Sequence, residues 1–261
     1  MSDLNLPLIY HREGAIATIH FNRPAVLNSI NAEVAQLFLS ACRAAESDPK
    51  VRVVILSAEG RGFVAGGDLK LFQSDPLGVP TSLIDPLHEG VRRLATMASP
   101  VIASLKGVVA GAGMSLALVC DLAIAAEGTK FNLAYLNVGA TCDVSASWSL
   151  PRVVGLRKAM EIALLNETLD ATEALRLGLV NRVVPAEKLV EQTHALAQRL
   201  AAGPALAIAN MKRLLRNSLD QTLEQQLAAE RQSFQECAAT TDFAEAVSAF
   251  LEKRPPRYSN K

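Results

Sequence analysis

The chain has 261 residues, of which half are hydrophobic and 20% are charged, and its 26 Lys and Arg balance its 26 Asp and Glu. This length suits one large domain, or a core with a smaller helical segment, at roughly 100–200 residues per domain. The net charge of zero excludes a general electrostatic attraction to nucleic acid or to an anionic membrane, so an anionic ligand must be held by local contacts.

The opening segment, MSDLNLPLIYHREG, is polar and lacks a charged start followed by an apolar core. No apolar run in the chain reaches the roughly 18 residues that a membrane span needs. The four cysteines, Cys42, Cys120, Cys142 and Cys237, show no metal-ligand spacing, and we expect them to be reduced thiols. The sequence therefore predicts a cytoplasmic protein that is neither secreted nor membrane-spanning and that holds no metal.

Strands and helices alternate through the first half of the chain. Four apolar runs predict strands, at residues 15–21, 51–57, 99–105 and 121–127. Two helices are predicted between them, over residues 31–47 and 111–119. The first of these has Val34, Leu37, Phe38 and Cys42 on one face. The pattern predicts an α/β spiral of repeating strands and helices, not a doubly wound sheet.

Two regions depart from this alternation of strands and helices. Residues 70–90 contain Pro76, Gly78, Pro80 and Pro86, so we expect a loop there before a helix that runs to Ala98. Strand patterns stop at about residue 195, and amphipathic helical patterns continue on both sides of a break at 203–204. We therefore expect a core over residues 1–195 and a helical region over residues 196–261.

Two glycine-rich segments carry most of the functional information: VAGGDL at 64–69 and GVVAGAGMSLAL at 107–118. Gly107 ends a predicted strand, and Ala112 lies near a helix start, where the first N–H groups have no partner within the helix and the helix dipole adds positive charge. If the fold brings Gly67 and Ala112 together, their two amides form an oxyanion hole. The alternative is that these small residues serve only close packing of helix and strand.

Five blocks at characteristic separations resemble the crotonase superfamily, the enoyl-CoA hydratases and isomerases. They are FNRPAVLNSI (21–30), GRGFVAGGDL (60–69), the long block from Ser99 to Glu127, LPRVVG (150–155) and AVSAFLEKR (246–254). The resemblance implies a crotonase-type ββα spiral core with an acyl-CoA site and a C-terminal helical trimerisation region. It implies a homotrimer or homohexamer, and no cofactor beyond the coenzyme A moiety of the substrate. Self-packing of the helices within a monomer is the alternative.

The resemblance also implies site residues. Gly67 and Ala112 would form the oxyanion hole, with Gly66 and Gly111 beside them. The residues implied to contact the coenzyme are Val26, Leu27, Ala65 and Leu69, with Phe250 and Lys253 from the last helix of a neighbouring subunit. Asp68 would hold the loop more than it would do chemistry. Lys253 could equally be a solvated residue of the basic tail.

Family hydratases carry two glutamates, at positions that correspond to Ser115 and Tyr135 in this chain. Adding water across a double bond needs a base and an acid, and neither carboxylate is present, although Tyr135 could still contact the substrate. A carboxylate does occur eight residues later, at Asp143. Two branches of the family place an acid there: the enoyl-CoA isomerases, including the phenylacetate-pathway isomerase, and 4-chlorobenzoyl-CoA dehalogenase. The sequence motifs of this chain resemble the isomerase branch more closely.

One carboxylate suffices for an isomerase, which takes a proton from C2 of a 3-enoyl thioester and returns it to C4. A carboxylate with a free pKa of about 3.9 needs desolvation to act as this base, and we expect Val138, Val144 and Trp148 to provide it. The alternative is that Asp143 only caps the helix beginning near Val144. His88 matches the dehalogenase histidine that activates water, or it is an exposed surface residue.

These observations favour an acyl-CoA isomerase that moves a double bond toward the thioester, with Asp143 as the proton shuttle. The alternatives are a divergent enoyl-CoA hydratase, a hydrolytic dehalogenase with Asp143 as the nucleophile and His88 as its partner, and a non-catalytic acyl-CoA-binding subunit. The length and chemistry of the acyl chain stay open.

Overall fold

The computed structural model describes residues 6–259, in which nine strands form two sheets. The large sheet consists, in spatial order, of β1 (Leu8–Glu13), β2 (Ile16–Phe21), β3 (Val53–Ala58), β4 (Val101–Leu105), β6 (Leu122–Ala126) and β9 (Arg182–Val184). The small sheet consists of β5 (Val108–Ala110), β7 (Lys130–Asn132) and β8 (Leu169–Asp170). In the large sheet only the pairing of β1 with β2 is antiparallel.

Successive turns of the chain place one strand in each sheet. β4 of the large sheet leads to β5 of the small one, and β6 leads to β7 in the same way. Single parallel bridges, Val64 with Val109 and Ile30 with Gly67, extend the small sheet to the earlier turns. The predicted α/β spiral is therefore confirmed, and it stacks the segment after β3 directly against the segment after β4.

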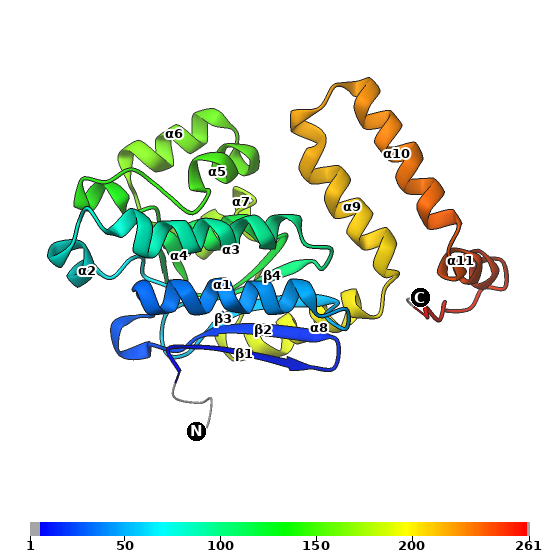
Figure 1. The fold of residues 1–261 in the computed structure, drawn as a ribbon, viewed down its shortest axis with the longest axis horizontal. Helices are drawn as coiled ribbons and strands as arrows, with labels where there is room; N and C mark the ends of the chain where they lie inside the picture. The colour runs from blue at the N-terminus through cyan, green and yellow to red at the C-terminus, as the bar shows by residue number, and fades with distance from the viewer. Residues whose placement is uncertain (1–5, 260–261) are drawn as a thin grey trace.

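Eleven α-helices are distributed around the sheets in the described residues (Figure 1). They are α1 (Ala32–Ser47), α2 (Leu69–Ser74), α3 (Asp85–Thr96), α4 (Ala112–Val119), α5 (Ala146–Val154), α6 (Leu156–Leu165), α7 (Ala171–Arg176), α8 (Leu189–Ala201), α9 (Ala205–Asn217), α10 (Leu223–Ala238) and α11 (Thr241–Leu251). Helices α1 and α3 lie against each other, and α8 packs on β3, β4 and β6. None of the helices in residues 6–259 is long and apolar enough to cross a membrane.

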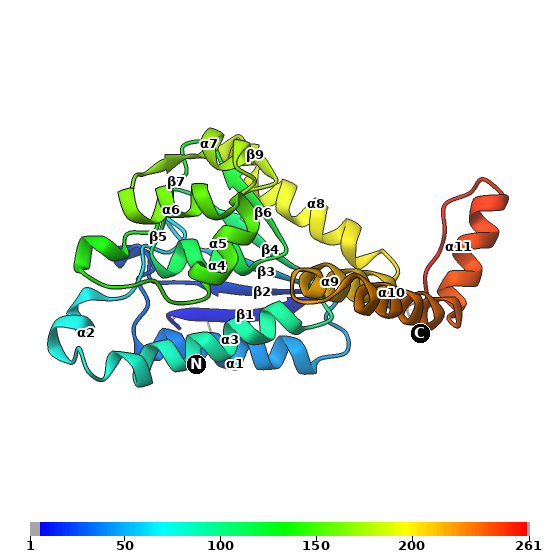
Figure 2. The same cartoon turned by 90° about the horizontal axis from the view of Figure 1, so that it is seen from above.

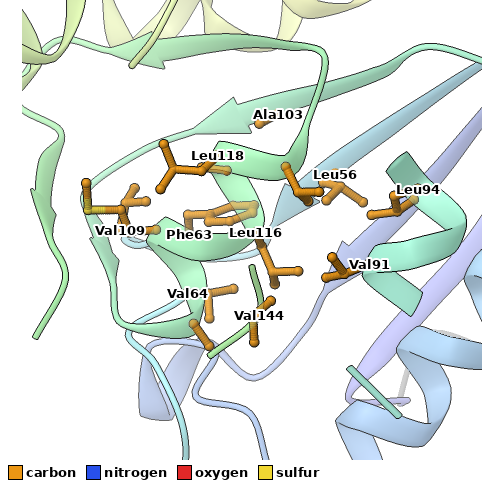
Figure 3. Close-up of a cluster of buried hydrophobic side chains, with 14 of the residues drawn as sticks. Leu56, Phe63, Val64, Val91, Leu94, Ala103, Val109, Leu116, Leu118 and Val144 are labelled. Atoms are coloured by element: carbon orange, nitrogen blue, oxygen red, sulfur yellow. The ribbon is translucent and has the colours of Figure 1, made fainter. Parts of the chain in front are cut away.

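The alternation of side chains along β3 divides the core into two layers. Val53 and Ile55 point to the face covered by α8 and pack in a cluster with Ala197. Val54 and Leu56 point to the opposite face and join the main core. Figure 3 shows part of this main core, where Leu56 of β3 and Leu116 of α4 lie in one cluster. Both faces of the parallel strands are thus buried, as is usual for parallel sheets.

The four predicted strands and the helices predicted over 31–47 and 111–119 all occur, within one or two residues. Two features differ from the prediction. Residues 69–74 and 80–90 are helical where a loop was predicted, and Pro80 and Pro86 stand in the first turns of their helices, where proline is tolerated. The opening polar segment contains β1, an edge strand whose side chains are mostly solvated. Residue 195 lies inside α8, and the next helix break is at Gly203.

The last three helices form an arm that projects from the core (Figures 1 and 2). Its anchor is buried: Lys212 Nζ on α9 contacts Asp121 Oδ2 at 2.8 Å and donates to the carbonyl oxygens of Leu94 and Ser99. Arg216 contacts Asp121 Oδ1 at 2.7 Å. Large exposed apolar side chains lie along the arm, at Met211, Leu215, Leu219, Leu223, Leu227, Phe234, Val247, Phe250 and Leu251.

We expect Asp121→Asn to destabilise the protein by about 3 kcal/mol, because the substitution leaves the buried ammonium of Lys212 without a counter-charge. Urea unfolding measures the loss. The matched control is Asp220→Asn, which breaks an exposed ion pair with Arg152 and should cost less than about 1 kcal/mol. Equal midpoints for the two variants would contradict the anchoring role of Asp121.

Candidate active site

The two glycine-rich segments are in backbone contact. A Cβ added at Gly111 would lie 3.2 Å from the Cα of Gly66, and φ at Gly111 is +53°, a region that L-residues rarely adopt. A Cβ added at Gly113 would lie 2.1 Å from the carbonyl oxygen of Val64, which is too close for any side chain. The N–H of Ala110 donates to the same Val64 oxygen at 2.9 Å. Only glycine permits this approach.

The contact leaves two N–H groups without a protein acceptor. Around Gly67, the bridge to the preceding turn uses the carbonyl of Gly66 and the N–H of Asp68, and it skips the N–H of Gly67. Ala112 is the first residue of α4, where an N–H has no partner in the helix. Among residues 6–259, neither N–H donates a hydrogen bond to a protein acceptor. The backbone thus provides two free donors on adjacent turns of the spiral.

The loop at 23–30 supports the first donor. The N–H of Ala65 donates to the carbonyl of Leu27 at 3.1 Å, so two residues expected at the coenzyme are neighbours. Val26 and Leu69, also expected there, are largely exposed. Asp68 caps α2 by accepting from the N–H of Lys70, and it forms an ion pair with Arg23 at 3.3 Å. These contacts give Asp68 a structural role in holding the loop.

A chain of hydroxyl groups connects α4 to Asp143. The Tyr135 hydroxyl donates to Asp143 Oδ1 at 2.5 Å, and Ser115 Oγ lies 2.9 Å from the Tyr135 hydroxyl oxygen. Ser115 is fully buried and lies three residues beyond Ala112 on α4. The carboxyl group of Asp143 is therefore two hydrogen bonds away from the helix that carries the second free amide. The sequence pattern did not indicate this chain, since residue types alone do not reveal which hydroxyls meet.

Burial raises the pKa of Asp143 above its ordinary value, while the hydrogen bond from Tyr135 and the nearby His88 act in the opposite direction. The three apolar side chains expected around it differ in exposure. Val144 is fully buried, whereas Val138 and Trp148 are 48% and 39% exposed. Trp148 stacks under the guanidinium of Arg152, at 4.0 Å.

The backbone that carries Asp143 is held in an unusual conformation. Val144 has φ of +51° and Ser145 has φ of +69°, a region that is rare for a β-branched residue. The Val144 side chain lies in the same cluster as Val64 and Leu116 (Figure 3). Its N–H donates to His88 Nε2 at 3.1 Å, which requires an unprotonated Nε2. A buried side chain and a histidine acceptor thus fix the turn that presents Asp143.

Asp143 does not cap a helix. The N-cap position of α5 is Ser145, no side chain caps the helix there, and the carboxyl group of Asp143 accepts from Tyr135 instead. The helix-cap alternative is therefore wrong. His88 is an exposed side chain, as one alternative expected, but its ring nitrogen has a specific backbone partner next to Asp143.

Two further placements bear on the site. The Phe72 ring of α2 covers the Cα of Gly67, because a Cβ added there would lie 2.5 Å from Phe72 Cζ. Sequence reasoning missed this aromatic neighbour. Phe250 and Lys253, at the end of α11, are exposed and stand on the projecting arm, away from the end of the core that carries α2 (Figure 1).

Comparison with known proteins agrees with the fold and the loops. A family profile described as enoyl-CoA hydratase/isomerase matches residues 11–261. The chain belongs to this family. It is 37% identical to 1,2-epoxyphenylacetyl-CoA isomerase of Escherichia coli K12, with 97% of this chain and 98% of that protein covered. It is 33% identical to 2,3-dehydroadipyl-CoA hydratase of the same strain, with 97% and 99% covered.

Solved structures of the family have the same fold. An enoyl-CoA hydratase from Polaromonas sp. JS666 superposes with a TM-score of 0.91 at 34% identity, covering 96% of this chain and 99% of that one. An enoyl-CoA hydratase from Bacillus anthracis superposes with a TM-score of 0.93 at 27% identity, covering 98% and 100%. The crotonase-type fold and the membership of an enzyme family that acts on acyl-CoA thioesters are thereby confirmed.

We expect Asp143→Asn to be more stable than the parent protein at pH 7. Burial raises the pKa of Asp143 in the folded state, so above that pKa the ionised carboxylate costs more in the folded than in the unfolded chain. Asparagine removes this cost and can still accept from Tyr135. This gain in stability over the parent protein should disappear as the pH falls through the folded-state pKa of Asp143 toward the ordinary pKa of Asp. Thermal melts of both proteins at several pH values measure it.

The control is Asp48→Asn, for which the sign is opposite. A hydrogen bond from the N–H of Lys50 and the neighbouring Arg12 lower the pKa of Asp48, so its ionised form stabilises the folded state. Asp48→Asn should lose stability at pH 7 and match the parent protein at low pH. A stability difference of the same sign for both variants would contradict the assignment of Asp143 as a buried functional carboxylate.

Proposed function

We propose that this protein is an acyl-CoA isomerase that moves a double bond toward the thioester, with the N–H groups of Gly67 and Ala112 as the oxyanion hole and Asp143 as the proton shuttle. The observation that carries the proposal is the hydrogen-bonded chain of Ser115, Tyr135 and Asp143, which holds a single carboxylate. The 37% identity to a protein named as an acyl-CoA isomerase supports the same reading.

The chemistry follows from one base and two donors. Asp143 takes the proton from C2 of a 3-enoyl thioester, and the electron pair of the broken C–H bond moves into a dienolate. The negative charge gathers on the thioester oxygen, where the amides of Gly67 and Ala112 stabilise it. Asp143 then returns the proton to C4, which leaves the double bond between C2 and C3. The step moves only a proton within the substrate, so it requires no metal or redox cofactor.

The coenzyme is proposed to lie along the first loop, with Val26, Leu27, Ala65 and Leu69 as contacts. Phe250 and Lys253 are proposed to reach a neighbouring subunit's coenzyme, because both are exposed on an arm that leaves the core of its own subunit. Lys253 would meet a phosphate as a point charge. The apolar side chains exposed along the arm favour a homotrimer, or a homohexamer of two trimers, over self-packing.

A hydratase that uses Asp143 alone is the second candidate, since the 33% identical relative is named as a hydratase. Its weakness is chemical: water addition needs a base for the water and an acid for C2. The dehalogenase alternative would need His88 to activate water, and in this structure His88 Nε2 accepts from the Val144 N–H. A panel of 3-enoyl-, 2-enoyl- and 4-halobenzoyl-CoA thioesters separates the three.

We expect the purified protein to convert 3-enoyl-CoA to 2-enoyl-CoA and Asp143→Asn to lower kcat by at least about 10²-fold, the lower end of general acid–base contributions. In heavy water, mass spectrometry should find deuterium in the acyl chain to the extent that the site exchanges with solvent. Near-parental turnover by Asp143→Asn, or no migration with any 3-enoyl thioester, would overturn the proposal. Mass added covalently to the peptide containing Asp143 would establish the dehalogenase.

A second variant tests the oxyanion hole. Ala112→Pro deletes the N–H that stabilises the enolate and should lower kcat by roughly 10²–10³-fold. Ala112 is the first residue of α4, where proline is tolerated, so the fold should survive. Ala112→Gly keeps the N–H and serves as the control, with activity close to that of the parent protein. A folded Ala112→Pro protein with full activity would remove Ala112 from the site.

A further inference from the structure

We propose that Tyr135 is a positioning residue for Asp143, and that Ser115 holds the Tyr135 hydroxyl in the orientation that this role requires. The inference rests on the proposed function, in which Asp143 carries the proton. Ser115 and Tyr135 occupy the positions that correspond, by the family resemblance, to the two glutamates of the hydratases.

The number of hydroxyl hydrogens limits the direction of the hydrogen bonds among Ser115, Tyr135 and Asp143. A phenol has one hydrogen, and Tyr135 donates it to Asp143 Oδ1, so in the 2.9 Å contact with Ser115 the phenol oxygen can only accept. The one hydrogen of Ser115 Oγ is shared between the phenol oxygen and the carbonyl oxygen of Gly111. Ser115 is fully buried on α4, a helix in which every residue is buried. The backbone of Tyr135 is also held, since its N–H donates to the carbonyl of Leu133 at 2.8 Å. The donor to Asp143 is therefore fixed at both ends.

The position of this donor assigns different roles to the two oxygens of Asp143. Oδ1 accepts from Tyr135, whereas within residues 6–259 no side chain donates to Oδ2; the carboxyl group also accepts from the N–H of Asp143 itself. With Oδ1 held, the carboxyl group cannot rotate freely, and Oδ2 is left to take the substrate proton. Holding a reacting group in one geometry is worth a large factor in rate, because a small misplacement can cost about 10²-fold.

The same contact favours the ionised form of Asp143. A buried carboxyl group tends to remain protonated, and the Tyr135 hydrogen bond opposes this by stabilising the charged form and lowering the pKa of Asp143. Burial and the nearby Asp143 raise the pKa of the Tyr135 phenol, so the phenol stays protonated as a donor. Tyr135 and His88 are the titratable groups that act on Asp143 in the described part of the chain.

Ser115 also contacts the oxyanion loop. Its N–H donates to the carbonyl of Gly111 at 3.1 Å, and its Oγ lies 3.3 Å from the same oxygen. That carbonyl belongs to the peptide group whose N–H is the free donor of Ala112. Ser115 thus supports Asp143 through Tyr135, and it supports the peptide group between Gly111 and Ala112 through its bonds to the Gly111 carbonyl. These contacts fix the position of Asp143 relative to the Ala112 N–H.

The test is Tyr135→Phe, which removes the hydroxyl and keeps the ring. We expect kcat to fall by about 10- to 100-fold with little change in KM. The acid limb of the profile of kcat/KM against pH should move to higher pH, because the donor that lowers the pKa of Asp143 is lost. Ser115→Ala should move the limb in the same direction by a smaller amount.

A second readout needs no turnover. Carbon-13 NMR of labelled Asp carboxyl groups, with the Asp143 signal assigned by its loss in Asp143→Asn, gives the titration midpoint of the free protein. Tyr135→Phe should raise this midpoint. Replacing the three tyrosines by 3-fluorotyrosine strengthens the phenol as a donor while keeping the shape of the site, so it should lower the midpoint even where Tyr135→Phe fails to fold.

Tyr10→Phe and Ser104→Ala are the matched controls, since both residues lie on strands of the large sheet and outside the hydroxyl chain. Neither should change the midpoint or the profile. An Asp143 midpoint that responds to neither Tyr135→Phe nor fluorination overturns the inference, as does a Tyr135→Phe protein with parental kcat and profile while Asp143→Asn is inactive. Full activity of Asp143→Asn instead overturns the proposed function, and the NMR midpoints still decide the contact.

Discussion

The close backbone contact between the segment after β3 and the segment after β4 is the constraint on which the site depends. The spiral stacks these segments turn on turn, and glycine at positions 111 and 113 allows the chains to touch without side chains between them. The ladder of hydrogen bonds continues on both sides but skips the N–H groups of Gly67 and Ala112. An unpaired amide in a buried place costs free energy in a protein without ligand. In the proposed function, a bound oxyanion accepts a hydrogen bond from each of the two amides.

The turn that carries Asp143 is also held in a backbone conformation that its residues do not prefer. Asp143 is carried by a turn in which Val144 and Ser145 have positive φ, and such conformations persist only where the surroundings determine them. In this protein, the conformation of the turn is determined by the burial of Val144 in the main core and by the hydrogen bond from the Val144 N–H to His88 Nε2. The burial that raises the pKa of Asp143 makes it a stronger base and reduces the stability of the fold at neutral pH. Strain and burial are therefore concentrated at the residue proposed for the chemistry.

The fold was predictable from the sequence where one local signal was sufficient. The apolar runs of β3, β4 and β6 are buried on both faces, and their composition alone predicts strands. The edge strand β1 was missed, because solvent satisfies its polar side chains and the apolar pattern is weak. The helical turns over residues 80–90 were missed because prolines that begin a helix look like loop residues when read singly, whereas the helix expected to run to Ala98 is present as α3. The exposure of Val138 and Trp148 depends on how the 3-10 helix over 135–138 and helix α5 lie on the core, which no spacing in the sequence encodes.

The meeting of Ser115, Tyr135 and Asp143 depends in the same way on tertiary structure, and its charge balance bears on the choice between the candidate reactions. Two carboxylates at positions 115 and 135 would each repel the charge on Asp143 and favour its protonated form. A serine and a tyrosine instead direct one hydrogen toward it, which offsets part of the cost that burial imposes on the negative charge. A site with one stabilised base can take a proton and give the same proton back, as a double-bond shift requires. Water addition needs a second group of opposite protonation, and the side-chain hydrogen that Asp143 receives in the described residues comes from the Tyr135 phenol, whose pKa is raised and whose hydrogen is already donated to the base.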